Sequence, residues 1–130
     1  MATEKFSIKK RLQSFVYAFA GLKTLFKEEH NARIHVVVAV VVIVLGLLFH
    51  ISAMEWLAVL LCIALVFSLE LINSAIENLA DYTSPDKNDF IRRAKDMAAA
   101  AVLVSAMVSV VVGIIIFLPR IIGLINTSTH

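Results

Sequence analysis

Long apolar stretches, interrupted by short polar ones, make up most of this chain. The pattern predicts three membrane-spanning segments at 34–54, 55–81 and 97–118, because each is close to the roughly 20 residues that a helix needs to cross a bilayer. Pro119 is expected to stop the third span. The segment 82–95, between the second and third spans, is polar and rich in turn-forming residues.

The stretch before the first span has a different pattern, which predicts a surface helix over residues 6–27. Apolar side chains recur there at spacings of three and four, so that they share one face of a helix, whereas most lysines lie elsewhere. An amphipathic helix of this kind lies in the headgroup plane or packs against other protein, and both can hold. The apolar positions are Ile8, Leu12, Phe15, Phe19, Leu22 and Phe26.

The predicted fold class is therefore an all-α polytopic membrane protein, with an N-terminal amphipathic surface helix and three transmembrane helices. Composition agrees, since 60% of the 130 residues are hydrophobic, which leaves no room for a separate soluble domain. Residues 1–130 are expected to form a single integral-membrane domain. A lone cysteine, Cys62, excludes a disulfide framework and a thiolate metal cluster within one chain.

The distribution of basic residues predicts the orientation. Seven of the twelve Lys and Arg residues precede the first span, four lie between the second and third spans, and only Arg120 follows the third. The positive-inside rule then places the N-terminus in the cytoplasm and the C-terminus outside. The first 33 residues contain no unbroken apolar core of a signal peptide, and we expect a bacterial inner-membrane protein that keeps its N-terminus.

An acidic stripe in the second span is the strongest functional signal. Glu70, Asn73, Glu77 and Asp81 are spaced by three or four residues and share one helix face, after the uncharged run 56–69. A carboxylate at membrane depth costs about 2.5–3.5 kcal/mol on insertion scales, so it is normally kept for ions, protons or substrates. One buried Glu, neutralised by protonation, is a weaker explanation for several polar residues in register.

The residue types favour phosphoryl transfer. No glycine-rich phosphate loop is present, so oxygen ligands and basic residues are what remains. Mg²⁺ takes one or two carboxylates together with phosphate oxygens. Glu77 on the second span could hold such an ion, together with Glu29 just before the first span if these two helices meet. Arg92, Arg93 and Lys95 would offset the phosphate charge, or they form a simple stop-transfer cluster.

A deeper layer of the stripe suits an acceptor alcohol. Glu70 lies about 10 Å below Glu77 along a helix, a depth that suits a base for the hydroxyl of a lipid, with Asn73 orienting that hydroxyl. Small residues at intervals of four in the third span predict close helix packing and, with so few helices, favour a homo-oligomer. They are Ala101, Ser105, Ser109 and Gly113, continuing the run Ala98–Ala101.

These motifs resemble a known family. The runs Glu70-Leu-Ile-Asn-Ser-Ala-Ile-Glu77, Arg93-Ala-Lys-Asp-Met97 and Ala-Ala-Val-Leu103, with Asp81 between the first two, are similar to the signature of the prokaryotic diacylglycerol kinase family, which includes the undecaprenol kinases. The resemblance covers nearly the whole chain. It implies a homotrimer that depends on Mg²⁺ and ATP, with active sites at subunit boundaries near the cytoplasmic interface.

The resemblance also implies roles for single residues. Glu70 would be the proton acceptor, and Glu29 and Glu77 would hold metal and nucleotide; Glu29 is preferred to Glu28 because Glu29-x3-Arg33 keeps the family spacing. The lipid would meet Glu70, Asn73 and Ala99. The remaining ATP-binding residues would be Tyr17, Asp86, Lys87, Asn88, Lys95 and Asp96.

Two departures from the family pattern bear on the lipid. Ala98-Ala99 replaces a Gly-Ser pair and removes a hydroxyl near the lipid site, while Asn31-Ala-Arg33-Ile-His35 is closer to the undecaprenol kinase branch. The expected reaction is phosphorylation of a membrane lipid alcohol, diacylglycerol to phosphatidic acid first and undecaprenol as the alternative. A small proton-coupled transporter and an assembly subunit are the other classes considered. No nucleic-acid partner is expected.

Overall fold

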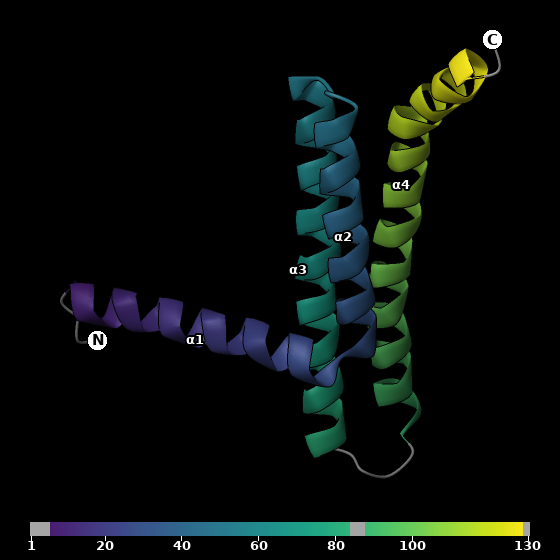
Figure 1. Cartoon of the computed structure of the whole chain (residues 1–130). Coiled ribbons are helices and arrows are strands. Elements are labelled where there is room, and N and C mark those ends of the chain that lie inside the picture. The colour runs from purple at the N-terminus through teal and green to yellow at the C-terminus, as the bar shows by residue number, and fades with distance from the viewer. Residues whose placement is uncertain (1–5, 84–87, 129–130) are drawn as a thin grey trace.

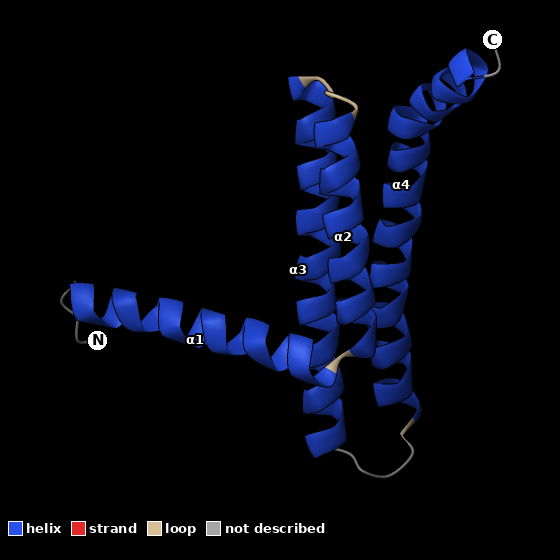
Figure 2. Ribbon diagram, in the orientation of Figure 1, coloured by secondary structure: helices blue, strands red, loops and turns tan. Residues whose placement is uncertain are grey.

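The computed structural model describes residues 6–83 and 88–128, and this part of the chain is entirely helical apart from short connections. Four helices follow one another: α1 (Ile8–Glu28), α2 (His30–Leu48), α3 (Ala53–Thr83) and α4 (Asp89–Ser128). The last three run side by side, and α1 leaves them at a steep angle near the end where α3 is connected to α4 (Figure 1). Figure 2 shows how short the connection between α1 and α2 is.

Helices α2, α3 and α4 are long and apolar enough to cross a membrane. Only a few of their apolar side chains are buried within the chain, and the bulky residues on their outer faces are exposed. Surfaces of this kind are normally covered by lipid or by partner helices. The all-helical fold class with three candidate spans is thus confirmed.

The turn between α2 and α3 lies earlier than expected. We expected the first span to continue to Met54, but α2 ends at Leu48, and His50 adopts the left-handed conformation with a φ of 50°. Ser52 and Glu55 then form a capping box: the Ser52 N–H donates to Glu55 Oε2 at 2.8 Å, and the Glu55 N–H donates to Ser52 Oγ at 3.2 Å. This reciprocal cap starts α3 before the second span was expected to begin.

Helix α4 is longer than the expected third span at both ends. Asn88 precedes its first residue and accepts a hydrogen bond from the Phe90 N–H at 2.9 Å, so the helix starts at Asp89 rather than near Met97. Pro119 does not end the helix, contrary to our expectation. A proline inside a helix removes one backbone hydrogen bond and bends the axis, and the yellow C-terminal part of α4 leans away from the bundle (Figure 1).

Close to Pro119, an ion pair joins α4 to the start of α3. Both terminal nitrogens of Arg120 donate to the carboxylate of Glu55, at 2.9 and 2.8 Å. Arg120 is the single Lys or Arg residue after the expected third span, and this pairing offsets its charge. The two-bond geometry also fixes the start of α3 against α4.

Close packing between α2 and α3 depends on a glycine. A Cβ at Gly46 would lie 2.7 Å from Cη2 of Trp56, so only a hydrogen fits there. The core nearby consists of Ile51, Val59, Ile116 and Phe117. Ser105 on α4 is also buried, so part of the small-residue pattern serves contacts within one chain.

Candidate functional site

The corner between α1 and α2 places Glu29 at the foot of the bundle. Glu29 is the single residue between the two helices and has extended backbone angles. The guanidinium of Arg33 donates to the carbonyl oxygens of Phe26 and Lys27, at 3.0 and 2.7 Å, which satisfies carbonyls at the end of α1. The Phe26 ring packs edge-on against Phe67 of α3. The corner is therefore held both by hydrogen bonds and by packing.

One hydrogen bond joins this corner to α3, and a second links two residues of the acidic stripe itself. Ser74 Oγ donates to Glu29 Oε1 at 3.2 Å, and Asn73 Nδ2 donates to Glu77 Oε1 at 3.3 Å. Ser74 and Glu77 are three residues apart, so their side chains are neighbours on the helix. The condition attached to Glu29, that its helix should meet the second span, is fulfilled.

Glu70 lies deeper, in contact with α2. Glu70 is only 2% exposed, and Nε2 of His35 lies 3.1 Å from Glu70 Oε1. This is an ion-pair distance, although the angles are not those of a hydrogen bond. Within the described residues, neither Glu70 Oε1 nor the buried Oδ1 of Asn73 accepts a hydrogen bond. Buried oxygens normally have a donor, so both are suited to one from a bound molecule.

A basic residue of α4 contacts the shallow end of the stripe. Lys95 of α4 pairs with Asp81 of α3, with 2.8 Å between Nζ and Oδ1, and its ammonium also lies in the field of Glu77. Asp96 is exposed and faces Arg92 at 3.7 Å. The start of α4 therefore brings a cation next to the shallow end of the acidic stripe.

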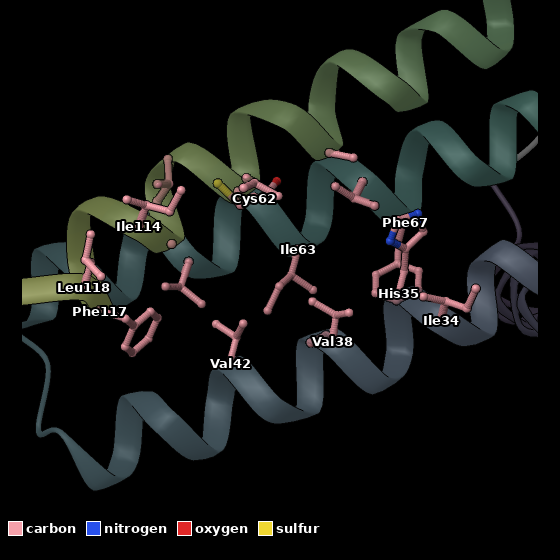
Figure 3. A pocket seen from close by; sticks show the side chains of 18 of the residues that line it. Ile34, His35, Val38, Val42, Cys62, Ile63, Phe67, Ile114, Phe117 and Leu118 are labelled. Carbon is pink, nitrogen blue, oxygen red and sulfur yellow. The ribbon is translucent and has the colours of Figure 1, made fainter. Parts of the chain in front are cut away.

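An apolar cavity of about 530 Å³ lies between α2, α3 and α4; we call it the apolar cavity. Figure 3 shows His35 and Phe67 at one end of it and Phe117 and Leu118 toward the other. Because His35 also contacts Glu70, the buried carboxylate lies next to one end of the cavity.

The other residues predicted for the site are more scattered. Tyr17 is 66% exposed on α1, which projects away from the bundle (Figure 1), so Tyr17 is not brought to the acids of its own chain. Asn88 caps α4, and Ala99 lies exposed on the same helix. Asp86 and Lys87 lie outside the described residues.

The acids at the corner fit a magnesium ion. No group of three or more His, Cys, Asp or Glu side chains gathers as a ready metal cage in the described ranges. Mg²⁺ does not require one, because it commonly takes one or two carboxylates and completes its shell with phosphate oxygens and water. Glu29 contacts Ser74, three residues from Glu77 on α3, so these two acids are the residues that would hold such an ion.

Comparison with known proteins gives the family. The profile of the prokaryotic diacylglycerol kinases matches residues 16–117. The chain belongs to this family. It is 39% identical to the undecaprenol kinase of Bacillus subtilis (strain 168) over 108 residues, which cover 83% of this chain and 88% of the relative. It is 30% identical to the diacylglycerol kinase of Escherichia coli (strain K12) over 95 residues, 73% of this chain and 78% of the relative.

A third relative is longer than this chain. The diacylglycerol kinase of Synechocystis sp. is 39% identical over 114 residues, which cover 87% of this chain but 65% of that protein. Membership of the family confirms the resemblance noted in the sequence and the expectation of a lipid kinase. With the three apolar helices, the bacterial relatives indicate a multi-pass bacterial membrane protein.

Sequence reasoning did not assign a role to three residues that shape the site. Arg33, His35 and Ser74 were noted only as parts of motifs. A signal for His35 was present, because an imidazole in an apolar run needs a polar partner. The identity of that partner depends on how α2 packs against α3, which the sequence alone does not show.

Proposed function

We propose that this chain transfers the γ-phosphoryl group of ATP to the hydroxyl of a membrane lipid alcohol, with diacylglycerol as the first candidate acceptor. The observation that carries the proposal is a stripe with two layers. Glu70 and Asn73 each present a buried oxygen that accepts no hydrogen bond from the residues that the structure describes, and Glu70 lies beside His35 at one end of the apolar cavity. Glu77, about 10 Å away along the same helix, lies beside Asn73 and the corner that carries Glu29.

In the deep layer, Glu70 would accept the proton of the lipid hydroxyl. The O–H bond breaks as the hydroxyl oxygen attacks the γ-phosphorus, a new P–O bond forms, and the bond to the departing ADP breaks. Asn73 would orient the hydroxyl through its carboxamide oxygen, which accepts no hydrogen bond from the described part of the chain. A carboxylate within hydrogen-bond reach of the proton it removes typically accelerates such a step by about 10²–10⁴-fold.

In the shallow layer, Glu29 and Glu77 would hold Mg²⁺. When bound, this ion would offset the negative charge of the phosphate groups. Lys95 supplies a further positive charge at this end and is held in place by Asp81. ATP is then contacted from the corner and from the start of α4. This division assigns the phosphates and the lipid to different depths of one helix face.

A second acceptor, undecaprenol, is favoured by two observations. The relative from Bacillus subtilis, of which 88% is covered, is named an undecaprenol kinase. The apolar cavity also follows α4 from Ala106 to Ile121, about 22 Å at the helical rise, which is enough for a long apolar chain. Both acceptors carry a hydroxyl on an apolar tail, so Glu70 would act on either in the same way.

We further propose that the protein is a homotrimer of the bacterial inner membrane, with its N-terminus in the cytoplasm and α1 on the cytoplasmic surface. The charge distribution supports this orientation, and the exposed apolar outer faces offer surface for partner helices. Tyr17 supports an oligomer as well. It lies away from the acids of its own chain on a projecting helix, where it could instead reach the site of a neighbouring copy.

The test is phosphate transfer by the purified protein in detergent micelles. Radiolabelled Mg-ATP would be supplied with diacylglycerol, undecaprenol or ceramide, and the labelled lipid measured beside ATP consumption without lipid. We expect label in at least one of the first two lipids and little ATP consumption in their absence. ATP-independent proton uptake with no labelled lipid would support the transporter class instead and refute the proposal.

A further inference from the structure

We propose that His35 is a positioning residue, whose imidazole holds the Glu70 carboxylate in a fixed orientation at the end of the apolar cavity. The inference rests on the proposed function, because it concerns the group that would accept the lipid proton. It adds a residue from a different helix, α2, to a stripe that otherwise belongs to α3.

The contact joins a buried acid to a residue at the rim of the cavity. The separation of His35 Nε2 and Glu70 Oε1 is 3.1 Å, and the side chains are 25% and 3% exposed. His35 is also part of the cavity lining and is seen there beside Phe67 (Figure 3). The imidazole therefore lies where a lipid in the cavity and the carboxylate would meet.

Glu70 has few other means of keeping its orientation. Its Oε1 accepts no hydrogen bond from the described residues, and the neighbouring charges of Glu29 and Glu77 repel a carboxylate. A glutamate side chain also has several rotatable bonds. His35 is the nitrogen-bearing side chain at ion-pair distance, and a small ring rotation would bring Nε2–H into line. Catalytic hydrogen bonds are often poorly aligned before substrate binds.

A purely structural role would produce a different result. The contact of α2 with α3 has other supports, including the close approach of Gly46 to Trp56 and the packing of Phe26 on Phe67 at the preceding corner. Loss of the imidazole should therefore leave the helices assembled. What it should change is the rate of the step in which Glu70 takes part.

The experiment compares His35→Ala and His35→Phe with His35→Gln, whose amide can place a nitrogen near the position of Nε2. Steady-state rates would be measured with Mg-ATP and whichever lipid alcohol the wild-type protein phosphorylates. Displacement of a reacting group by about 1 Å can cost about 10²-fold. We therefore expect Ala and Phe to lower kcat by about 10–100-fold with little change in the KM for Mg-ATP, and Gln to recover most of the rate. His30→Gln, at an exposed position on the same helix, is the matched control.

A double variant separates positioning from a general effect. In a Glu70→Gln background, removing the imidazole should have little further effect on kcat, because the two residues act as one unit. Independent, multiplying effects would overturn the proposal. So would full activity of His35→Ala, or loss of assembly in every His35 variant, which would show a structural role. Failure of the wild-type protein to phosphorylate any lipid would instead refute the proposed function itself.

Discussion

Ser74 of α3 donates a hydrogen bond to Glu29, the single residue between α1 and α2, with 3.2 Å between Oγ and Oε1. This contact brings an acid that precedes the first span onto the same turn of α3 as Glu77. Arg33 supports this contact by donating hydrogen bonds to two carbonyl oxygens at the end of α1. Residues 45 apart in the sequence thereby meet beside Glu77, where the proposed pair of carboxylates would lie.

The first prediction tests which acid at the corner is the proposed metal ligand, Glu29 or Glu28. Glu29→Gln should lower turnover by about 10²-fold or more, because a bound cation contributes several kcal/mol to transition-state stabilisation. Glu28→Gln should be mild, since Glu28 is an exposed residue at the end of α1, whereas Glu29 is the acid that Ser74 contacts. Rates measured as a function of Mg²⁺ concentration would check this. The reverse ranking would show that Glu28 is the ligand.

The second prediction concerns Lys95. Lys95→Met removes a cation beside the acidic stripe and leaves Asp81 unpaired, so the KM for Mg-ATP should rise by about tenfold, the effect of losing roughly 1.4 kcal/mol of binding. Lys9→Met, an exposed change on α1, is the control. An unchanged KM for the Lys95 variant would remove this residue from the nucleotide site.

The third prediction addresses folding rather than chemistry. Gly46→Ala should destabilise the protein by about 1–3 kcal/mol, as forced extra atoms do in packed cores, because the added Cβ meets the Trp56 ring at 2.7 Å. Gly21→Ala meets nothing within 4 Å and should be neutral or slightly stabilising through helix propensity. Thermal unfolding in detergent measures both. Equal stability of the two variants would contradict the close approach of α2 and α3.

The apolar pattern was enough to predict four helices, and the acidic spacing predicted one functional face on the third of them. Helix ends were harder, because they depend on local caps: the Ser52–Glu55 capping box and the left-handed His50 move the first turn. Pro119 was misread because proline can bend a long helix without ending it. The partner of Glu70 was not predictable, since the contact with His35 arises from packing between helices.

The fourth prediction tests the apolar cavity as the place of the lipid tail. Gly113 lines the cavity, and a Cβ there meets nothing within 4 Å. Gly113→Leu should therefore fill the cavity and raise the KM for the lipid, while the KM for Mg-ATP stays the same. Gly123→Leu, at another open position of α4 outside the cavity, is the matched control. Unaltered lipid kinetics in a correctly assembled Gly113 variant would argue against a lipid in this cavity.

The proposed mechanism divides the stripe into a lipid layer around Glu70 and a phosphate layer around Glu77. It predicts that Glu70→Gln lowers kcat by about 10²–10⁴-fold with nearly unchanged binding of Mg-ATP, because Glu29, Glu77 and Lys95 remain. Glu77→Gln should weaken nucleotide binding as well as catalysis.

The most direct measurement is the equilibrium binding of Mg-ATP to both variants in the absence of lipid, on protein shown to be assembled. We predict wild-type affinity for Glu70→Gln and clearly reduced affinity for Glu77→Gln. Equal loss of nucleotide binding in the two variants would contradict the account and place both acids in a single metal cluster.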